Sequence, residues 1–533
     1  MDPLANKGTA CTLEERRALG IDGLLPPRVE SLAEQADRVL ANVRARSGPL
    51  ERYMCLRGVR DENETLFFRV LADHLEELLP VVYTPTVGDA CTHWSDIYER
   101  PRGLYLSAWQ HRGRVGEVLR NWPRDRVGII VVTDGGRILG LGDLGVNGMG
   151  IPIGKLALYT ACAGVPPALG LPITLDVGTD NIALREHPLY LGERQPRLTG
   201  APYDEFLEEF VESAQAVFPG VIVQFEDFNN ASAFRLLGRF RDRLCCFNDD
   251  VQGTGAMGLA GLYSSGRITG KALREQRLLF VGAGEACLGM GGLVVSAMQH
   301  EGLSEAEALA RCLFVDSRGL VIASRADLPG HKRRFAQDRA PLPDLAAAVD
   351  AFQPTTIIGA CGQGGRFTED VLRAMARLND RPVVFALSNP TSKAECTAEQ
   401  AYAWTGDRAI FASGSPFPSV THAGHVHVSG QGNNAFVFPG VGLGLLVSGA
   451  RRVTDGMFFA AARALAGCVT GGELAEGRVF PAPARLREVS RVVAAAVADV
   501  AFSAGVAARR RPPDLAAAVA SAMWEPLYPQ AAH

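Results

Sequence analysis

The sequence lacks the features that would place the protein in a membrane or on a nucleic acid. Its longest apolar stretches, such as residues 437–450, are shorter than a bilayer span and rich in glycine, so we expect no transmembrane helix. No basic run suggests a nucleic-acid or lipid-headgroup surface, and the formal charge is −4, so we expect no polyanionic partner. Neither a secretory signal nor an Arg-rich presequence is recognisable at the start, so we expect a cytoplasmic protein.

The sequence also has no CxxC pair and few lysines. The eleven cysteines include no CxxC pair, which favours reduced thiols over a disulfide framework or a metal–thiolate site. Only five of the 54 basic residues are lysines, namely Lys7, Lys155, Lys271, Lys332 and Lys393. Because this chain uses arginine for most of its cations, a lysine in a glycine-rich motif is informative.

The pattern of apolar residues indicates an α/β protein with several domains. Amphipathic helix-like runs come first, then short apolar runs that each end in polar residues, which is typical of buried parallel strands. A second series of strands alternating with helices predicts a Rossmann-type doubly wound domain. We expect a helical N-terminal domain (1–101), a substrate- and metal-binding α/β domain (102–248, completed by 434–505), an NAD(P)-binding domain (249–433) and a C-terminal tail (506–533).

A glycine-rich segment, GAGEACLG at 282–289, follows the apolar run LLFV and opens a helix-like stretch. In this context glycines make a tight turn and let a pyrophosphate approach a helix N-terminus. Gly282 and Gly284 match the first two glycines of the dinucleotide pattern, and Cys287 replaces the third. The candidate cofactor-binding residues are Gly282, Ala283, Gly284, Glu285 and Ala286; the alternative is an ordinary glycine-rich turn.

The next predicted strand ends in Asp316, where an acid would contact the ribose. Ser317 and Arg318 follow it. Arg318 and the cluster Lys332–Arg334 could supply the cations that a 2′-phosphate requires, so the sequence favours NADP over NAD. A solvated basic turn is the alternative.

Two pairs of carboxylates end two predicted strands: Glu226 with Asp227, and Asp249 with Asp250. Because the carboxyl ends of parallel strands share one edge of a sheet, these charges should converge and repel one another. A hard cation such as Mg²⁺ or Mn²⁺ prefers oxygen ligands and would offset the repulsion. The alternative is that both pairs are helix caps or turns.

Three further residues are candidates for the chemistry. Lys155, in GMGIPIGK, could act as a general base if burial lowers its pKa, whereas arginine could not. Arg137 could offer a bidentate fork to a carboxylate. Tyr83 stands at a helix-to-loop break, where a phenol could donate a proton. A helix-terminal lysine and a packed core tyrosine are the alternatives.

Asparagines follow other strand or turn patterns. Asn389 in ALSNP, and Asn433 with Asn434 in GQGNN, could bind amide, carboxylate or ribose groups. Asparagine before proline is also an ordinary turn residue.

Taken together, nine ordered motifs closely resemble the malic enzyme family, and the resemblance covers nearly the whole chain. They are VVYTPTVG (81–88), TDGGRILGLGDLG (133–145), GMGIPIGKL (148–156), DVGTDN (176–181), QFEDF (224–228), CFNDDVQGT (246–254), VGAGEA (281–286), FALSNPTSKAEC (385–396) and GQGNNAFVFPG (430–440). The opening residues also look like the family's start, so we expect little or no targeting extension.

The resemblance implies oxidative decarboxylation of (S)-malate to pyruvate and CO₂ with reduction of NADP or NAD, in the presence of Mg²⁺ or Mn²⁺. It also implies a role for each motif residue. Lys155 corresponds to the general base and Tyr83 to the acid that protonates the enolate carbon, while Asp249 orients Lys155 or the metal cluster. The metal ligands would be Glu226, Asp227 and Asp250, and the malate-binding positions Arg137, Asn389, Asn433 and Asn434.

Some positions depart from the family pattern or refine it. Glu62 stands where some members carry an arginine for an activating dicarboxylate, so activation through that pocket is not expected. Lys332 and Phe335 match the spacing of NADP-preferring members. The family usually forms homotetramers built as pairs of dimers, so a homo-oligomer is expected. A malolactic enzyme and a non-catalytic dinucleotide-binding regulator are the alternative functions.

Overall fold

The computed structural model describes residues 2–529 and divides them into two compact units. One unit comprises the chain up to Asp227 together with the segment from Ala520, and the other is Phe228–Val519. No helix among the described residues is both long and apolar enough to cross a bilayer. All eleven cysteines are free thiols.

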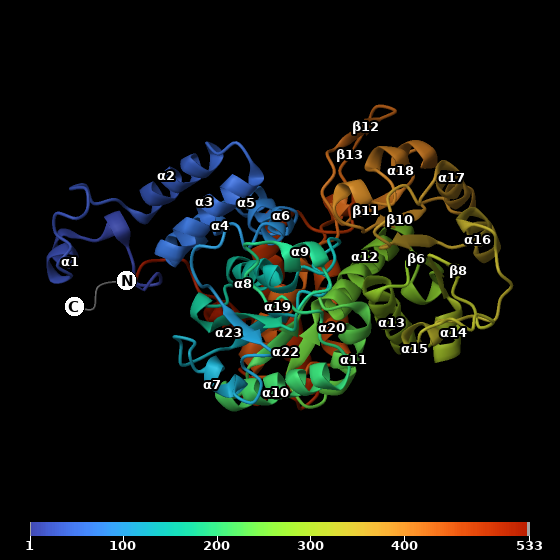
Figure 1. Ribbon diagram of the computed structural model, residues 1–533. Coiled ribbons are helices and arrows are strands. Elements are labelled where there is room, and N and C mark those ends of the chain that lie inside the picture. The colour runs from blue at the N-terminus through green and yellow to red at the C-terminus, as the bar shows by residue number, and fades with distance from the viewer. Residues whose placement is uncertain (1, 530–533) are drawn as a thin grey trace. The chain divides into compact units, whose positions relative to one another are not determined.

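The first unit begins with helices, as the amphipathic runs predict. Serine and threonine caps start two of them: Thr12 and Ser31 each accept a hydrogen bond from the backbone N–H three residues on, in complete capping boxes. These helices are coloured blue in Figure 1. They are α1 (Leu13–Ala18), α2 (Leu32–Arg44), α3 (Pro49–Glu62), α4 (Glu64–Asp73), α5 (Leu75–Val82) and α6 (Thr86–Thr92).

A parallel sheet follows, with strand order β1-β3-β2-β4-β5. The apolar runs at 129–133, 170–176 and 222–225 form buried strands as expected, whereas the partly exposed strand β1 carries no such signal. The strands are β1 (Leu104–Ser107), β2 (Ile129–Thr133), β3 (Gly170–Asp176), β4 (Ile222–Phe225) and β5 (Cys246–Asn248). Helices of the first unit's α/β part are α7 (Val115–Leu119), α8 (Gly150–Ala163), α9 (Ile182–Glu186) and α10 (Ala201–Val217).

The second unit contains a seven-stranded sheet of order β14-β11-β10-β9-β6-β7-β8, in which only the β7–β8 pair is antiparallel. The chain passes from β6 to β7 on one side and later to β9 on the other, so the carboxyl end of β6 is a topological switch point. The strands are β6 (Leu278–Val281), β7 (Cys312–Asp316), β8 (Gly319–Leu320), β9 (Thr356–Gly359), β10 (Val383–Ala386), β11 (Ile410–Ser413) and β14 (Gly430–Gln431).

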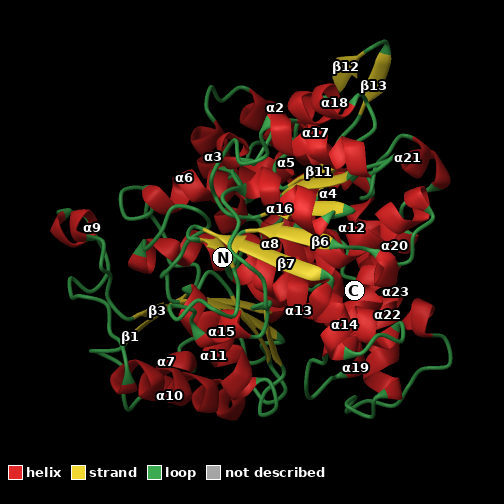
Figure 2. Cartoon of the chain, turned by 90° about the vertical axis from the view of Figure 1, so that its right-hand side faces the viewer, coloured by secondary structure: helices red, strands yellow, loops and turns green. Residues whose placement is uncertain are grey.

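Helices cover both faces of this sheet, as Figure 2 shows for β6, β7 and β11. On one face, strand residues such as Leu279 and Leu313 share a core with the three helices α16 (Leu345–Phe352), α17 (Glu369–Leu378) and α18 (Ala398–Thr405). On the other, Phe314 lies against Gly291 of α13 (Glu285–His300) and Phe385 against Gly261 of α12 (Thr254–Thr269). This doubly wound arrangement confirms the predicted fold class.

The remaining elements of the second unit are helical, apart from an exposed hairpin of β12 (Val420–His422) and β13 (His425–His427) that the sequence did not indicate. The helices are α11 (Asn230–Phe240), α14 (Glu305–Ala310), α15 (Gly330–Arg333), α19 (Phe438–Ser448), α20 (Asp455–Gly467), α21 (Gly471–Ala475) and α22 (Leu486–Ser503); α23 (Leu515–Ala522) ends the helical part of the chain. The expected boundaries of the domains stay a prediction.

Candidate active site

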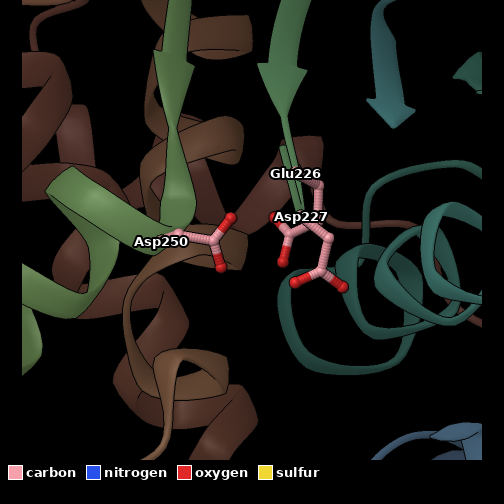
Figure 3. Close-up of side chains that lie close together, drawn as sticks. All are labelled: Glu226, Asp227 and Asp250. Atoms are coloured by element: carbon pink, nitrogen blue, oxygen red, sulfur yellow. The ribbon is translucent and has the colours of Figure 1, made fainter. Parts of the chain in front are cut away.

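Three carboxylates lie close together at the carboxyl ends of their strands. Glu226 and Asp227 directly follow β4, and Asp250 follows β5 as the second residue of a π-helical turn (Asp249–Gly253). Figure 3 shows their carboxylates directed toward one another, and one oxygen from each lies within 4.8 Å of the others. Glu226 and Asp227 are buried and Asp250 is half-buried, so the three negative charges lie close together where water has limited access.

This group fits a hard divalent cation. Every donor is a carboxylate oxygen, which Mg²⁺ and Mn²⁺ prefer. At a metal–oxygen distance of about 2.1 Å, opposite ligands of an octahedral ion stand about 4.2 Å apart, close to the observed spread. Three ligands would leave positions for a substrate.

Glu226 and Asp227 are held in position by hydrogen bonds from residues of their own unit. Gln224 donates from Nε2 to Glu226 Oε2 at 2.7 Å and in turn accepts a hydrogen bond from the Tyr159 hydroxyl. The backbone N–H of Leu139 donates to Asp227 Oδ1 at 3.2 Å. Asp227 itself has a φ of +54°, unusual for a residue other than glycine. Such an enforced backbone conformation is common at functional sites.

Lys155 lies directly beside this group. It is on α8, a helix whose fourteen residues are all buried, and its Nζ is 2.8 Å from Glu226 Oε1. Only 2% of the Lys155 side chain is exposed. The Tyr83 ring lies 5.4 Å from the Lys155 Nζ, and Tyr83 ends α5 as predicted, just before the cis Thr84–Pro85 bond. Two groups suited to handling protons therefore lie near one another, and the lysine contacts one of the three carboxylates.

Arg137 is an exposed residue of the turn that follows β2. The turn is tied to a carboxylate of the group, because the backbone N–H of Arg137 donates to the Asp227 carbonyl at 3.1 Å. Behind it stands Arg197, which sequence reasoning missed: its Nη2 donates to the backbone oxygen of Asp134 at 2.7 Å and pairs with the buried Asp134 carboxylate. No local motif marks Arg197, since the contact joins residues 63 apart.

In the second unit, Asp249 is fully buried and paired with a predicted asparagine. Asn434 donates from Nδ2 to Asp249 Oδ2 at 3.0 Å and to Thr254 Oγ1 at 2.9 Å. Asn433 accepts from the N–H of Ala435 at 2.9 Å and so caps the next turn. These contacts fix the GQGNN segment against the start of α12.

Asn389 lies at the cis Asn389–Pro390 bond after β10. Its Oδ1 accepts a hydrogen bond from Ser415 Oγ at 2.6 Å. The side chain is therefore oriented by the segment that follows β11, at the carboxyl edge of the sheet.

The π-helical turn that carries Asp250 packs on a glycine of α13. A Cβ on Gly289 would stand 2.3 Å from the Val251 carbonyl oxygen, closer than atoms approach without displacement. We expect Gly289→Ala to lower the melting temperature by several degrees and to weaken divalent-metal binding, because the turn must move. Differential scanning calorimetry and a Mn²⁺ titration measure the two effects.

Gly292→Ala in the same helix is the matched control, since nothing lies within 4 Å of its added Cβ. It should be neutral or stabilising, because alanine is favoured over glycine in a helix by about 1 kcal/mol. Equal behaviour of the two variants would contradict the packing argument.

The glycine-rich turn after β6 has the geometry of a dinucleotide site. Gly282 has a φ of +122°, and a Cβ there would meet the Ala360 carbonyl oxygen at 3.0 Å. Gly284 is the N-cap of α13, which begins at Glu285, so free N–H groups of a helix start face the switch point. Cys287 is buried against this turn and fills the packing role of the third glycine. The turn, with Ala283 and Ala286, fits a pyrophosphate.

Asp316 ends β7, and two cations bind its carboxylate. Lys332 Nζ donates at 2.9 Å, and Arg325, which sequence reasoning missed, donates from Nη1 at 2.8 Å and Nη2 at 3.1 Å. Burial by itself would raise the pKa of Asp316, but these hydrogen bonds outweigh it and lower the pKa below its usual range.

The other predicted cations of this region point elsewhere or stay exposed. Arg318 pairs with Asp327 at 2.8 Å and Arg334 with Glu305 at 2.9 Å, while Ser317 is exposed. Of the predicted basic cluster, Lys332 is therefore the residue that contacts Asp316, the acid expected to bind the ribose.

The fold and this geometry define a dinucleotide-binding α/β protein with a carboxylate group suited to a divalent metal. Residues 60–241 match the family model for the malic enzyme N-terminal domain, and residues 251–502 match that for the malic enzyme NAD binding domain. This chain belongs to the malic enzyme family.

Individual relatives agree with that assignment. The chain is 48% identical to the NADP-dependent malic enzyme of Homo sapiens over 94% of its own length and 88% of that protein's. It is 47% identical to the NADP-dependent malic enzyme of Columba livia, over 99% and 95% of the two chains. The solved structure of Entamoeba histolytica malic enzyme shares the fold at a TM-score of 0.60 and 21% identity, covering 95% of this chain and 90% of that one.

Proposed function

We propose that this protein catalyses the oxidative decarboxylation of (S)-malate to pyruvate and CO₂ with reduction of NADP. The observation that carries the proposal is the buried contact between Lys155 and Glu226 at 2.8 Å, within the carboxylate group. A side chain that can take up and release a proton thus lies beside a carboxylate of the candidate metal site. Membership of the malic enzyme family and relatives described as NADP-dependent support the reaction and the cofactor.

Glu226, Asp227 and Asp250 would hold a divalent cation, Mg²⁺ or Mn²⁺. That cation would supply Lewis-acid polarisation of the substrate's C2 oxygen, and NADP would accept the hydride from C2. By holding the cation, the three side chains would fix the position of the malate C2 oxygen at the sheet edge. Gln224 and the backbone of Leu139 keep two of the carboxylates from rotating.

Lys155 would take the hydroxyl proton of malate. Its amine is buried and lies 2.8 Å from Glu226 Oε1. Burial disfavours the charged form of an amine, and a cation held by Glu226 would weaken the attraction of that carboxylate for the proton. Proton uptake is a function that the guanidinium of arginine does not perform.

Tyr83 would return a proton to C3 after CO₂ has left. Its ring lies 5.4 Å from the Lys155 Nζ, so its hydroxyl would be the second proton carrier, beside Lys155. Arg137, Asn389, Asn433 and Asn434 would bind the carboxylates of malate, and Asp249 would orient Asn434 through their 3.0 Å hydrogen bond.

A spectrophotometric assay with malate, Mn²⁺ and NADP tests the proposal. We expect NADPH to form with stoichiometric pyruvate, and a parallel assay with NAD to be slower. The absence of reduced cofactor with both nucleotides would sink the proposal, and lactate formed without net cofactor reduction would indicate a malolactic enzyme instead.

Lys332 would contact the 2′-phosphate of NADP. In Lys332→Gln we expect KM for NADP to rise about 10- to 100-fold, the value of one charge-assisted hydrogen bond, and KM for NAD to stay nearly constant. Initial rates against each nucleotide measure this. Arg333→Gln is the control, because Arg333 is the exposed neighbour whose guanidinium meets only a backbone oxygen at 3.5 Å. A parallel rise for both nucleotides would contradict phosphate contact.

We further propose a cytoplasmic homo-oligomer, a dimer or a tetramer. The free state of all eleven cysteines supports a reducing compartment. Exposed leucines in the N-terminal segment, Leu13, Leu19 and Leu24, are candidates for such an interface. Light scattering at several protein concentrations measures the mass.

A further inference from the structure

Two arginines on one face of α3 line a cavity in the helical part of the first unit. Arg57 and Arg60 are three residues apart and so project to the same side of the helix. The free space inside the cavity is about 30 Å³. That is room for about two water-sized groups, such as the two oxygens of a carboxylate.

Both arginines have a buried nitrogen without an acceptor. Among the described residues, neither Arg57 Nε nor Arg60 Nε has a hydrogen-bond partner. The Arg57 side chain donates from Nη2 to the Ile97 carbonyl at 2.7 Å and pairs with Glu99 at 3.0 Å, and Arg60 donates from Nη1 to the Ile153 carbonyl at 3.2 Å. The Nε hydrogens remain, and buried donors without acceptors destabilise a protein.

The nearby acids do not accept a hydrogen bond from Arg60 Nε, because another arginine binds them. Arg102 binds Asp61 at 2.8 Å and Glu64 at 2.6 Å, which leaves Glu64 Oε1 3.7 Å from Arg60 Nε, beyond hydrogen-bond range. Arg60 is 9% exposed. Burial and the charge of Arg102 lower the pKa of Arg60 to about 10, so its positive charge is incompletely compensated.

Arg197, in the same unit, is a buried arginine whose charge is compensated by several acceptors. Its guanidinium donates to the backbone oxygens of Asp134 and Gly178 and pairs with the carboxylates of Asp134 and Asp143. Burial alone would lower the pKa of Arg197, but those carboxylates outweigh burial and raise it. The missing acceptors at Arg57 and Arg60 are therefore a local feature of the cavity.

Apart from the charged residues Asp61, Arg100 and Arg102, the rest of the lining is apolar or aromatic. Leu56, Phe67, Val82 and Ile153 contribute aliphatic and ring surfaces, and helices α3, α4, α5 and α8 that carry them are labelled in Figure 1. Tyr53, Trp94 and Tyr98 add further rings. Two cationic donors above apolar walls are complementary to an anion with an apolar body.

We propose that this cavity is an effector site for a small organic carboxylate. Its two oxygens would accept the Nε hydrogens of Arg57 and Arg60, and its body would pack on the apolar walls. Glu62, the residue that replaces a family arginine, is not among the residues that line this cavity.

An occupant would touch the backbone next to both proton carriers. Val82 and Gly154 line the cavity and are the chain neighbours of Tyr83 and Lys155. Gly154 also lies against the Tyr83 ring, since a Cβ there would be 2.9 Å from Tyr83 Cδ2. Binding should therefore change turnover, a part of the proposal that rests on the proposed function.

Binding is tested without turnover, by isothermal titration calorimetry of the full chain with propionate and benzoate in the absence of malate, metal and nucleotide. We expect one site per chain and binding at least tenfold tighter than that of propionamide and benzamide, which lack the charge. Arg60→Gln and Arg57→Met should each weaken carboxylate binding at least tenfold, while Arg44→Gln, which removes an exposed arginine paired with Glu77, should not.

The melting temperatures of the variants exclude a trivial loss of folding. Each substitution removes an unmatched buried donor but also a hydrogen bond to a backbone oxygen, so the two effects offset one another, and neither Arg60→Gln nor Arg57→Met should melt more than about 5 °C earlier than the wild type. Equal binding of acids and amides, binding unchanged in both variants, or a crystal structure with a partner subunit's side chain in the cavity would overturn the site.

The effect on turnover is measured separately. With propionate or benzoate at its measured dissociation constant, we expect malate turnover by the wild type to change at least twofold and that of Arg57→Met to stay constant. Bound carboxylate with unchanged turnover would overturn the effector role. An inactive wild type would contradict the proposed function, and the calorimetry would still decide the site.

Discussion

Replacing Lys155 with alanine is expected to lower kcat about 10²- to 10⁴-fold, the usual effect of removing a positioned base. The side chain is 2% exposed and its amine lies 2.8 Å from Glu226, so water has little access to replace it. KM for malate should change much less, because Lys155 acts on the hydroxyl proton and not on the carboxylates. Steady-state kinetics over pH measure both parameters.

Two further variants separate proton transfer from charge. Lys155→Arg keeps a cation beside Glu226 but offers no titratable amine, so it should be nearly as slow as the alanine variant. Lys271→Ala removes an exposed lysine and should match the wild type. An active Lys155→Arg enzyme would show that the charge alone matters and that another group is the base.

Asp250→Asn is expected to weaken Mn²⁺ binding at least about 10²-fold and to lower activity accordingly. Loss of residues that only support metal ligands already costs about 10- to 100-fold in affinity, and Asp250 would be a ligand itself. The amide keeps the size of the side chain, so the π-helical turn and its packing on Gly289 should survive. Electron paramagnetic resonance of free Mn²⁺ gives the affinity directly.

Asp242→Asn is the matched control. Asp242 is 80% exposed and lies 3.8 Å from Arg452, so its loss should leave Mn²⁺ binding unchanged. If excess Mn²⁺ restores Asp250→Asn to full activity, the residue contributes affinity only. If Mn²⁺ binds the variant as tightly as the wild type, Asp250 is not a ligand.

Much of this site was predictable because strand ends are local features of a sequence. Glu226, Asp227 and Asp250 each follow a short apolar run, and parallel strands bring their carboxyl ends to one edge. Their grouping within 4.8 Å follows from that topology. The glycines before α13 were equally visible, since Gly282 needs a positive φ and a close approach to Ala360.

Partners distant in sequence were not predictable. Arg325 resembles any other arginine in a loop, and only the turn after β8 brings it to Asp316. Arg197 reaches Asp134 across 63 residues, and no spacing rule announces such a contact. Strand β1 was missed because its residues are only half-buried at one end, which weakens the apolar pattern.

The amino-acid sequence by itself determined the alternation of strands and helices, the family, and the chemical types available at each strand end, because these depend on periodicity and on short motifs. Tertiary structure alone decided which of those groups meet. It placed the Lys155 amine on Glu226 and Lys332 on Asp316, and it left the Nε groups of Arg57 and Arg60 without acceptors beside a cavity. Burial and pairing arise from the packing of segments distant in the chain, and the protonation and ligand preferences of these side chains depend on that packing.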